Sequence, residues 1–299
     1  MFNKVPEVTL YFWVIKILCT TVGETAADYL NDNLGFGLTN TTYATGALLV
    51  VLLVTQFRLR RYVPAIYWAV VVVVSVFGTL ITDNLTDRYN VPLTTTTPIF
   101  AIVLAIVFAT WWGFERTLSI HTIITTRREA FYWLAVLFTF ALGTAAGDLV
   151  AEKADLGYAV SIAIFGGAIA VVAFAHYVLK LNPVLSFWLA YILTRPLGAS
   201  IGDEMSQTSH KYGGLGLGTT DTSYIFLGCI LALVIFLSWS KRDQTPPEVV
   251  LAEEAEAAAR RGEAHDHPHH LPHPHLPHPH LPHGGDHSPP RTDPLSQEG

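Results

Sequence analysis

Apolar residues fall into long blocks along this chain, and short polar segments separate the blocks. Clear examples are residues 47–57, 69–77, 99–112 and 162–175. With neighbouring small and hydroxyl residues, each block reaches about 20 positions, enough to cross a hydrocarbon core of about 30 Å. Backbone groups inside that core must hydrogen-bond to one another, so the blocks are expected to be helices. The pattern predicts eight membrane helices, at about 8–30, 41–57, 63–86, 96–114, 129–151, 158–179, 183–205 and 219–240.

The composition agrees with an all-α integral membrane protein whose partner is the lipid bilayer. Hydrophobic residues make up 51% of the chain and charged residues only 14%, whereas soluble domains carry about 25% charged residues. The first apolar stretch contains Lys16 and Glu24 and lacks a small-residue cleavage site, so we expect a membrane helix there rather than a signal peptide. No basic patch with interleaved aromatic residues is present, so no nucleic-acid partner is expected.

A tryptophan, a glycine ten residues later and an aspartate fifteen residues later occur together four times. The tryptophans are Trp13, Trp68, Trp133 and Trp188, the glycines are Gly23, Gly78, Gly143 and Gly198, and the aspartates are Asp28, Asp83, Asp148 and Asp203. Such regular self-similarity indicates a repeat architecture. We predict a transmembrane domain over 1–243, built from four two-helix repeats at about 4–61, 62–126, 127–181 and 182–243.

Basic residues in the short loops predict the orientation of the helices. Ten of them fall on one predicted side, namely Lys4, Arg58, Arg60, Arg61, Arg116, Arg127, Arg128, Lys180, Lys241 and Arg242. The other side has three, namely Arg88, Lys153 and Lys211. Because cytoplasmic loops are enriched in Lys and Arg, both termini are expected in the cytoplasm. Every repeat then begins on the same side, so the repeats are parallel copies.

The spacing within the repeat converts into depth in the membrane. A helix rises about 1.5 Å per residue, so tryptophans at the inner interface would place the glycines about 15 Å higher and the aspartates about 22 Å higher. We expect the tryptophans to anchor the helices at the interface. The glycines are expected to allow close helix packing.

The four aspartates are the strongest candidates for function. A carboxylate at this depth costs about 2.5–3.5 kcal/mol on insertion scales and usually faces a cavity or a partner. A shared cation or proton site is therefore predicted. The alternative is that each aspartate caps the following loop or ends its helix near the outer headgroups.

The first and last repeats carry additional charges. Residues four apart stack on one helix face, so Lys16, Glu24 and Asp28 share a stripe on the first helix. The seventh helix carries Arg195 and Asp203 on the equivalent stripe, at the positions of Thr20 and Asp28. For Lys16 and Arg195 the alternative is snorkelling to the inner interface. The residues expected to serve transport or proton coupling are Lys16, Glu24, Asp28, Asp83, Asp148, Arg195 and Asp203.

At these residues the chain resembles a family of bacterial multi-spanning proteins. The family consists of uncharacterised membrane-anchored proteins with four tandem repeats of unknown function, each with two membrane spans and a tryptophan. The resemblance covers residues 4–243 and rests on the segment 4–9, on Phe12-Trp13, Ile15-Lys16 and Gly23-Glu24-Thr25, and on the later Trp–Gly–Asp copies. It implies the architecture and a bacterial inner membrane, but no particular activity.

The C-terminal segment 244–299 has a different composition. Residues 246–261 are acidic and alanine-rich, which predicts a short helix. Prolines then favour an extended, disordered chain. Its histidines could bind a transition metal; the alternative is a low-complexity tail with incidental metal affinity. These residues are His265, His267, His269, His270, His273, His275, His278, His280, His283 and His287.

The sequence favours a transporter over an enzyme. Neither a zinc-protease motif, a nucleophile elbow nor a phosphate-binding loop is present, and no cofactor is required. The leading hypothesis is proton-coupled efflux of a divalent cation. Oxygen ligands on the helices suit Mn²⁺ or Mg²⁺, whereas the histidines of the tail suit borderline ions. The alternatives are a transporter or channel for another small solute, and a non-transporting scaffold or metal sensor.

Overall fold

The computed structural model describes residues 3–208 and 213–262, and these are almost entirely helical. The long helices are α1 (Leu10–Asp28), α2 (Gly37–Arg58), α3 (Pro64–Asp83), α4 (Leu93–Glu115), α5 (Thr126–Asp148), α6 (Tyr158–Tyr177), α7 (Pro183–Ser206), α8 (Thr219–Ser240) and α9 (Pro247–Arg261). Eight of the helices in this described part, α1 to α8, are long and apolar enough to cross a membrane. The chain is therefore a multi-pass membrane protein, as predicted.

Three helices, α2, α4 and α5, begin three or four residues earlier than the sequence predicts, and two of them begin in polar segments. α2 starts at Gly37 and α4 at Leu93, within polar segments that were expected to be loops. Polar residues are compatible with a helix here because a hydroxyl side chain can donate to a carbonyl oxygen of the preceding helical turn. Thr42 Oγ1 donates in this way to the carbonyl oxygen of Leu38 at 2.7 Å. The threonine hydroxyl groups therefore do not prevent these segments from being helical.

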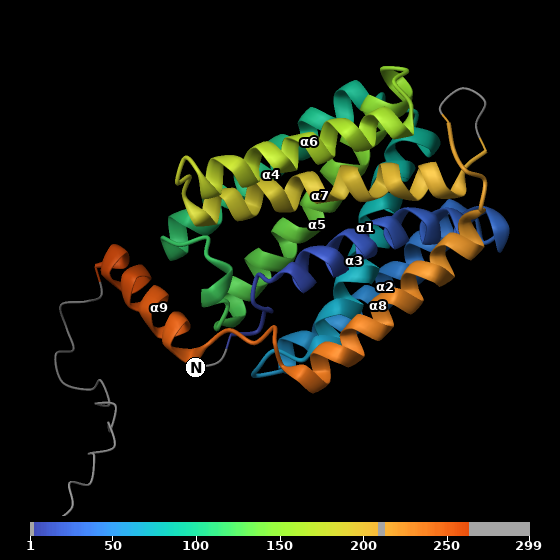
Figure 1. The fold of residues 1–299 in the computed structure, drawn as a ribbon. Helices are drawn as coiled ribbons and strands as arrows, with labels where there is room; N and C mark the ends of the chain where they lie inside the picture. Colours follow the sequence, from blue (N-terminus) through green and yellow to red (C-terminus); the bar gives the residue numbers. More distant parts are fainter. Residues whose placement is uncertain (1–2, 209–212, 263–299) are drawn as a thin grey trace, which may run out of the picture. The chain divides into compact units, whose positions relative to one another are not determined.

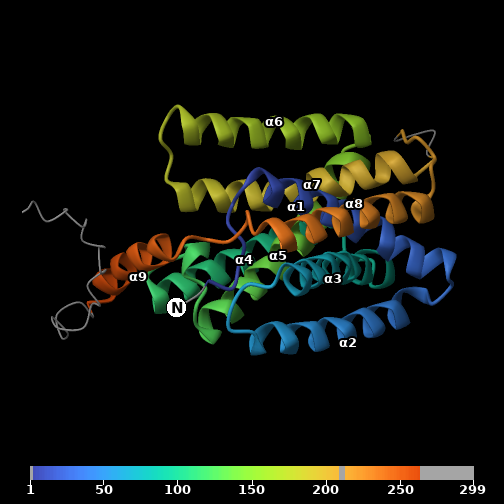
Figure 2. The same ribbon diagram turned by 60° about the horizontal axis from the view of Figure 1, so that its bottom comes forward.

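The first helices of the four repeats form an inner ring. α1 contacts α3, α3 contacts α5, α5 contacts α7, and α7 contacts α1 (Figure 1). Each second helix packs outside the ring on the first helix of the next repeat: α2 on α3, α4 on α5, α6 on α7 and α8 on α1. Figure 2 shows α2 and α6 on opposite faces, with the inner helices between them. The four repeats thus form one bundle with approximate fourfold symmetry.

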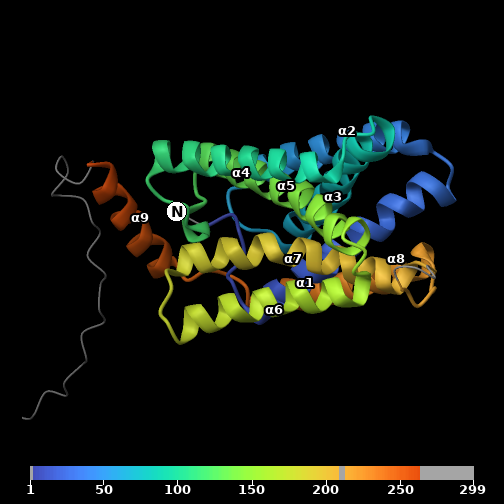
Figure 3. The ribbon, with the colours of Figure 1, turned by 90° about the horizontal axis from the view of Figure 1, so that it is seen from above.

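Burial separates the inner helices from the outer ones. More than half of the apolar window of each inner helix is buried, against 28% or less for each outer helix. The outer helices therefore carry the lipid-facing surface. Figure 3 shows the long helices running along one common direction, with α9 leaving that direction. We call the two ends of the bundle the tryptophan end and the aspartate end, after the repeated residues that lie there.

The repeated glycines lie at the contacts between neighbouring inner helices. Each faces the residue seven positions after the tryptophan of the adjoining repeat, in the pairs Gly23–Ser75, Gly78–Phe140, Gly143–Arg195 and Gly198–Thr20. A Cβ atom at any of the four would lie 2.7 Å or less from the side chain of the partner. The same glycine contact therefore joins each pair of neighbouring inner helices, and small residues make this close approach possible.

The tryptophans differ from expectation. Trp68, Trp133 and Trp188 are at most 4% exposed, so interfacial anchoring against lipid does not hold for these three. They pack against other aromatic rings inside the bundle, and Trp188 Nε1 donates to the carbonyl oxygen of Leu118 at 2.9 Å. Trp188 therefore has both apolar and polar partners within the protein. The Nε1 atoms of Trp68 and Trp133 have no hydrogen-bond partner among the described residues, so these two indoles are held inside the bundle by the packing of their rings. Trp13 is half-buried.

An aromatic layer closes the ring at the tryptophan end. It consists of the residue before each tryptophan, namely Phe12, Tyr67, Tyr132 and Phe187, and none of these is more than 9% exposed. The ring centroids of Phe12 and Phe187 lie 5.9 Å apart. The hydroxyl groups of Tyr67 and Tyr132 share a hydrogen bond. The aromatic layer therefore fills the space between the four inner helices at this end.

Candidate functional site

Side chains stack in layers along the inside of the ring. Because residues four apart share a helix face, positions three, seven, eleven and fifteen after each tryptophan follow the aromatic layer in order. The lysine layer is Lys16, Val71, Val136 and Tyr191; the arginine layer is Thr20, Ser75, Phe140 and Arg195; and the glutamate layer is Glu24, Thr79, Thr144 and Ala199. No residue of these three layers is more than 7% exposed. The repeated aspartates form the last layer.

Arg195 on α7 forms a buried ion pair with Glu24 on α1. Its Nη2 donates to Oε2 of Glu24 at 2.8 Å, and its Nη1 donates to the carbonyl oxygen of Thr20 at 2.9 Å. The side chain of Arg195 is 0% exposed and that of Glu24 is 9% exposed. The additional charges identified in the sequence lie on α1 and α7, and this ion pair joins these two helices directly.

Two threonines complete the surroundings of Arg195, and neither was predicted from the sequence to belong to the site. Arg195 Nη2 also donates to Thr144 Oγ1 on α5 at 2.7 Å and to Thr79 Oγ1 on α3. Both threonines occupy the same repeat position as Glu24, four residues before the aspartate. This shared repeat position is the feature of the sequence that could have indicated the two threonines as site residues. All four inner helices thus meet at one guanidinium group.

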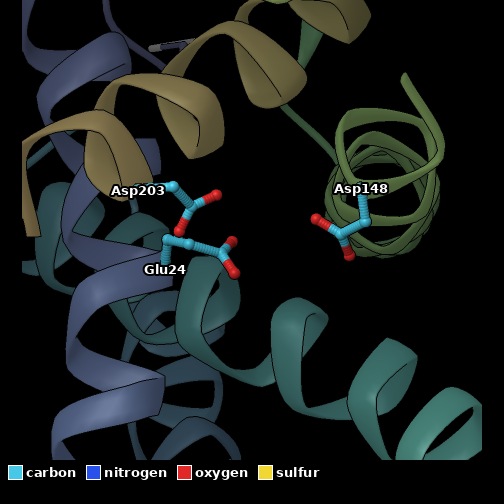
Figure 4. A group of neighbouring side chains, drawn as sticks. All are labelled: Glu24, Asp148 and Asp203. Carbon is cyan, nitrogen blue, oxygen red and sulfur yellow. The ribbon is translucent and has the colours of Figure 1, made fainter. Parts of the chain in front are cut away.

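Three carboxyl groups converge beside this ion pair. Glu24, Asp148 and Asp203 each offer an oxygen atom, and these three atoms lie within 4.8 Å of one another. Figure 4 shows the three side chains pointing into one space from α1, α5 and α7. We call them the carboxylate cluster. Oxygen atoms at this spacing could hold a cation between them.

The other two aspartates lie near the carboxylate cluster. Asp28 Oδ2 accepts a hydrogen bond from Gln207 Nε2 at 3.2 Å. Asp83 interacts electrostatically with Glu24, Asp148 and Asp28. Asp28, Asp83 and Asp148 are only half-buried. The aspartate end of the axis is therefore more accessible than the layers below it.

The aspartates do not cap the segments that follow them in the first three repeats. Each is the last α-helical residue before a π-helical turn, at Tyr29–Asn33, Asn84–Arg88 and Leu149–Lys153. None of the three side chains forms a capping hydrogen bond to its turn. The capping alternative therefore does not hold in these repeats. Single π-helical turns often occur at functional sites.

Lys16 is also enclosed. It is 1% exposed, and its Nζ lies 4.1 Å from the ring centroid of Phe140 and 4.2 Å from that of Tyr191. Among the residues that the structure describes, Nζ has no hydrogen-bond partner. Aromatic faces attract an ammonium group. Neither Lys16 nor Arg195 snorkels to an interface, so that alternative is wrong for both.

The four structural repeats coincide with four matches to one protein family. The family model, described as Repeat of Unknown Function (DUF347), matches residues 11–62, 66–117, 131–182 and 186–243. The chain belongs to this family. Each match holds one inner and one outer helix, so the family's repeat is the two-helix unit and the predicted resemblance is confirmed. No curated protein and no solved structure matches the chain.

A separate polar cluster lies at the tryptophan end. His121 pairs through Nδ1 with Oε1 of Glu253 on α9 at 2.7 Å, and through Nε2 with Oε1 of Glu7 at 3.3 Å. Next to it, Arg128 on α5 and Arg261 both pair with Glu254. These contacts hold α9, the helix predicted from the acidic segment, against the end of the bundle. The histidines predicted to bind metal, 265–287, lie outside the described residues.

The docking of α9 is expected to weaken at high pH. Burial disfavours the charged form of His121, but hydrogen bonds and ion pairs with Glu253 and Glu7 outweigh burial and raise its pKa from 6.5 to about 9. A raised pKa in the folded state stabilises the contact fully below the unfolded pKa, and this stabilisation is lost as the pH rises through the folded pKa. Amide hydrogen exchange of α9, corrected for intrinsic rates, should therefore be faster at pH 9.5 than at pH 6.5.

The variant His121→Gln checks this assignment. It removes the cation, so exchange in α9 should be fast at both pH values. His176→Gln changes a histidine on the outer helix α6 and should leave the pH dependence intact. A wild-type chain with equal protection of α9 at both pH values would contradict the role of His121.

Proposed function

We propose that this chain is a membrane transporter that exchanges a divalent metal cation for protons. The observation that carries the proposal is the carboxylate cluster, in which acidic side chains from three inner helices converge on one axis. Ionisable groups within membrane spans are energetically expensive, and those that occur usually mark ion pathways or proton relays.

The chemistry of the carboxylate cluster favours a hard cation such as Mn²⁺ or Mg²⁺, because such ions prefer oxygen ligands. Carboxyl groups this close repel one another when all are ionised, so they share protons when no cation is bound. A bound cation displaces those protons. Cation binding is therefore coupled to proton release, and this coupling is the physical basis of exchange.

The proposed orientation places both termini in the cytoplasm of a bacterium, on the basis of the ten basic residues against three in the short loops. The aspartate end then faces outward, and the aromatic layer closes the axis toward the cytoplasm. Efflux requires a second conformation in which the aromatic layer opens. In this scheme the histidine-rich tail binds metal ions in the cytoplasm as an accessory to transport.

The variant Asp148→Asn is expected to reduce Mn²⁺ flux driven by a pH gradient by at least about tenfold, because an amide neither holds the cation as strongly nor releases a proton. The measurement uses liposomes that contain the purified full chain. Asp221→Asn is the matched control, since Asp221 is exposed in the first turn of the outer helix α8. Full flux with Asp148→Asn, or equal losses in both variants, would count against the proposed site.

A further inference from the structure

Oxygen atoms of the kind that bind a metal ion surround Arg195. The guanidinium group donates to a carboxylate oxygen of Glu24, to the hydroxyl oxygens of Thr79 and Thr144, and to the backbone carbonyl oxygen of Thr20. These four acceptors come from three different helices, and Arg195 itself is 0% exposed. The guanidinium group of Arg195 is therefore surrounded by oxygen atoms that could otherwise bind a metal ion.

The charge pair occurs once in a repeat that is otherwise uncharged at these positions. The arginine layer contains Thr20, Ser75 and Phe140 besides Arg195, and the glutamate layer contains Thr79, Thr144 and Ala199 besides Glu24. Close helix packing alone does not explain this ion pair, because neutral residues make the equivalent helix contacts in the other repeats. The one cation and the one added anion face each other at 2.8 Å.

Glu24 belongs to two groups at once. It pairs with Arg195, and it also supplies one oxygen of the carboxylate cluster with Asp148 and Asp203. A metal cation bound by the carboxylate cluster must therefore compete with Arg195 for Glu24. The guanidinium group cannot lose its proton to withdraw from this competition, so it must move away or share the carboxylate.

From this shared use of Glu24 we infer that Arg195 is a tethered cation, which takes the place of the metal when the transport site is empty. The inference rests on the proposed function and deepens it. A metal-free site without Arg195 would have one more negative charge to neutralise than its shared protons cover. A carboxylate left ionised in the membrane without a counter-charge strongly opposes any conformational change that buries it further. With Arg195 paired to Glu24, the metal-free transporter carries its protons on the rest of the carboxylate cluster, has no unpaired charge on Glu24, and can return.

The next residue, Pro196, gives α7 a means to move the guanidinium group. Proline inside a helix removes a backbone hydrogen bond and weakens or kinks the helix at that point. Pro196 lies within α7 and packs against Gly143 and Gly147 of α5, where side-chain bulk is absent. α7 is therefore most easily bent next to Arg195, the residue that must move when a metal binds.

The test compares two fluxes of radiolabelled Mn²⁺ in liposomes that contain the purified full chain. Net uptake is measured into Mn²⁺-free liposomes, and exchange is measured into liposomes loaded with unlabelled Mn²⁺. Wild type should perform both. In Arg195→Gln, net uptake should fall by about tenfold while exchange stays within about twofold, since only the empty return step needs the tethered charge. Arg195→Lys should retain net uptake.

Arg88→Gln is the matched control, because Arg88 is exposed near the aspartate end; both of its fluxes should equal those of wild type. Equal loss of net uptake and exchange in Arg195→Gln, or unchanged net uptake, would overturn the inference. Wild-type liposomes that move Mn²⁺ in neither mode would instead overturn the proposed function, and the inference would fall with it.

A binding measurement covers the case in which Arg195→Gln does not fold. The shorter ammonium group of Arg195→Lys cannot keep the several contacts of the guanidinium group, so it competes less well for Glu24. Calorimetry in detergent should show Mn²⁺ binding several-fold tighter than in wild type. Unchanged or weaker Mn²⁺ affinity in this variant would also overturn the inference.

Discussion

Replacing Glu24 with glutamine is expected to lower the free energy of unfolding by about 3–5 kcal/mol, because it leaves a buried arginine without its counter-charge. Arg195 is 0% exposed and pairs with Glu24 at 2.8 Å. Its remaining partners are neutral oxygens from Thr20, Thr79 and Thr144, which solvate the charge but do not cancel it. Thermal or SDS-induced unfolding in detergent micelles measures the loss.

The double variant Glu24→Gln/Arg195→Gln isolates the charge pair. It removes both charges together, so most of the lost stability should return. Glu256→Gln is the control for an ion pair in general: its pair with Arg260 is exposed, and such pairs contribute less than about 1 kcal/mol. A double variant as unstable as Glu24→Gln would show that the unpaired charge is not the cause.

Alanine at Gly198 is the second large effect that we expect, with a loss of about 1–3 kcal/mol from overpacking. A Cβ at this position would overlap the side chain of Thr20 and would lie 3.1 Å from the carbonyl oxygen of Ile17 on α1. Thr20 cannot easily turn aside, because its hydroxyl donates to Ile17 and to Thr194. α1 and α7 must therefore separate, which strains the ring where it closes.

The control for this prediction is Gly228→Ala on the outer helix α8. An added Cβ at Gly228 meets nothing within 4 Å, so the stability should stay the same or rise slightly, since alanine favours the helix. Both variants are compared by the same unfolding measurement. Equal stability of Gly198→Ala and wild type would contradict the close approach of α1 and α7.

Much of the fold follows from the sequence because its signals are local. Apolar length predicts the membrane helices, and the constant spacing of Trp, Gly and Asp predicts equivalent helices in parallel repeats. The stripe of Lys16, Glu24 and Asp28 also follows, since side chains four apart must share a face of α1. These features need no knowledge of which helices are neighbours.

The site itself depends on neighbours, and there the sequence is insufficient. Thr79 and Thr144 become partners of Arg195 only because the ring brings α3 and α5 to α7. The tryptophan prediction failed for a related reason. The interfacial rule applies to lipid-facing indoles, whereas Trp68 packs on Phe12 of α1 and Trp188 packs on Phe108 and Trp111 of α4. Docking of α9 through His121 is likewise a contact between distant segments of the chain.

The most direct test of the central claim follows Mn²⁺ and pH together in liposomes that contain the wild-type chain. With an acidic interior and Mn²⁺ outside, exchange predicts that Mn²⁺ accumulates against its gradient while the internal pH rises, and that removing the pH gradient abolishes the accumulation. Mn²⁺ movement no faster than in protein-free liposomes, or accumulation that ignores the pH gradient, would contradict proton-coupled cation transport by this chain.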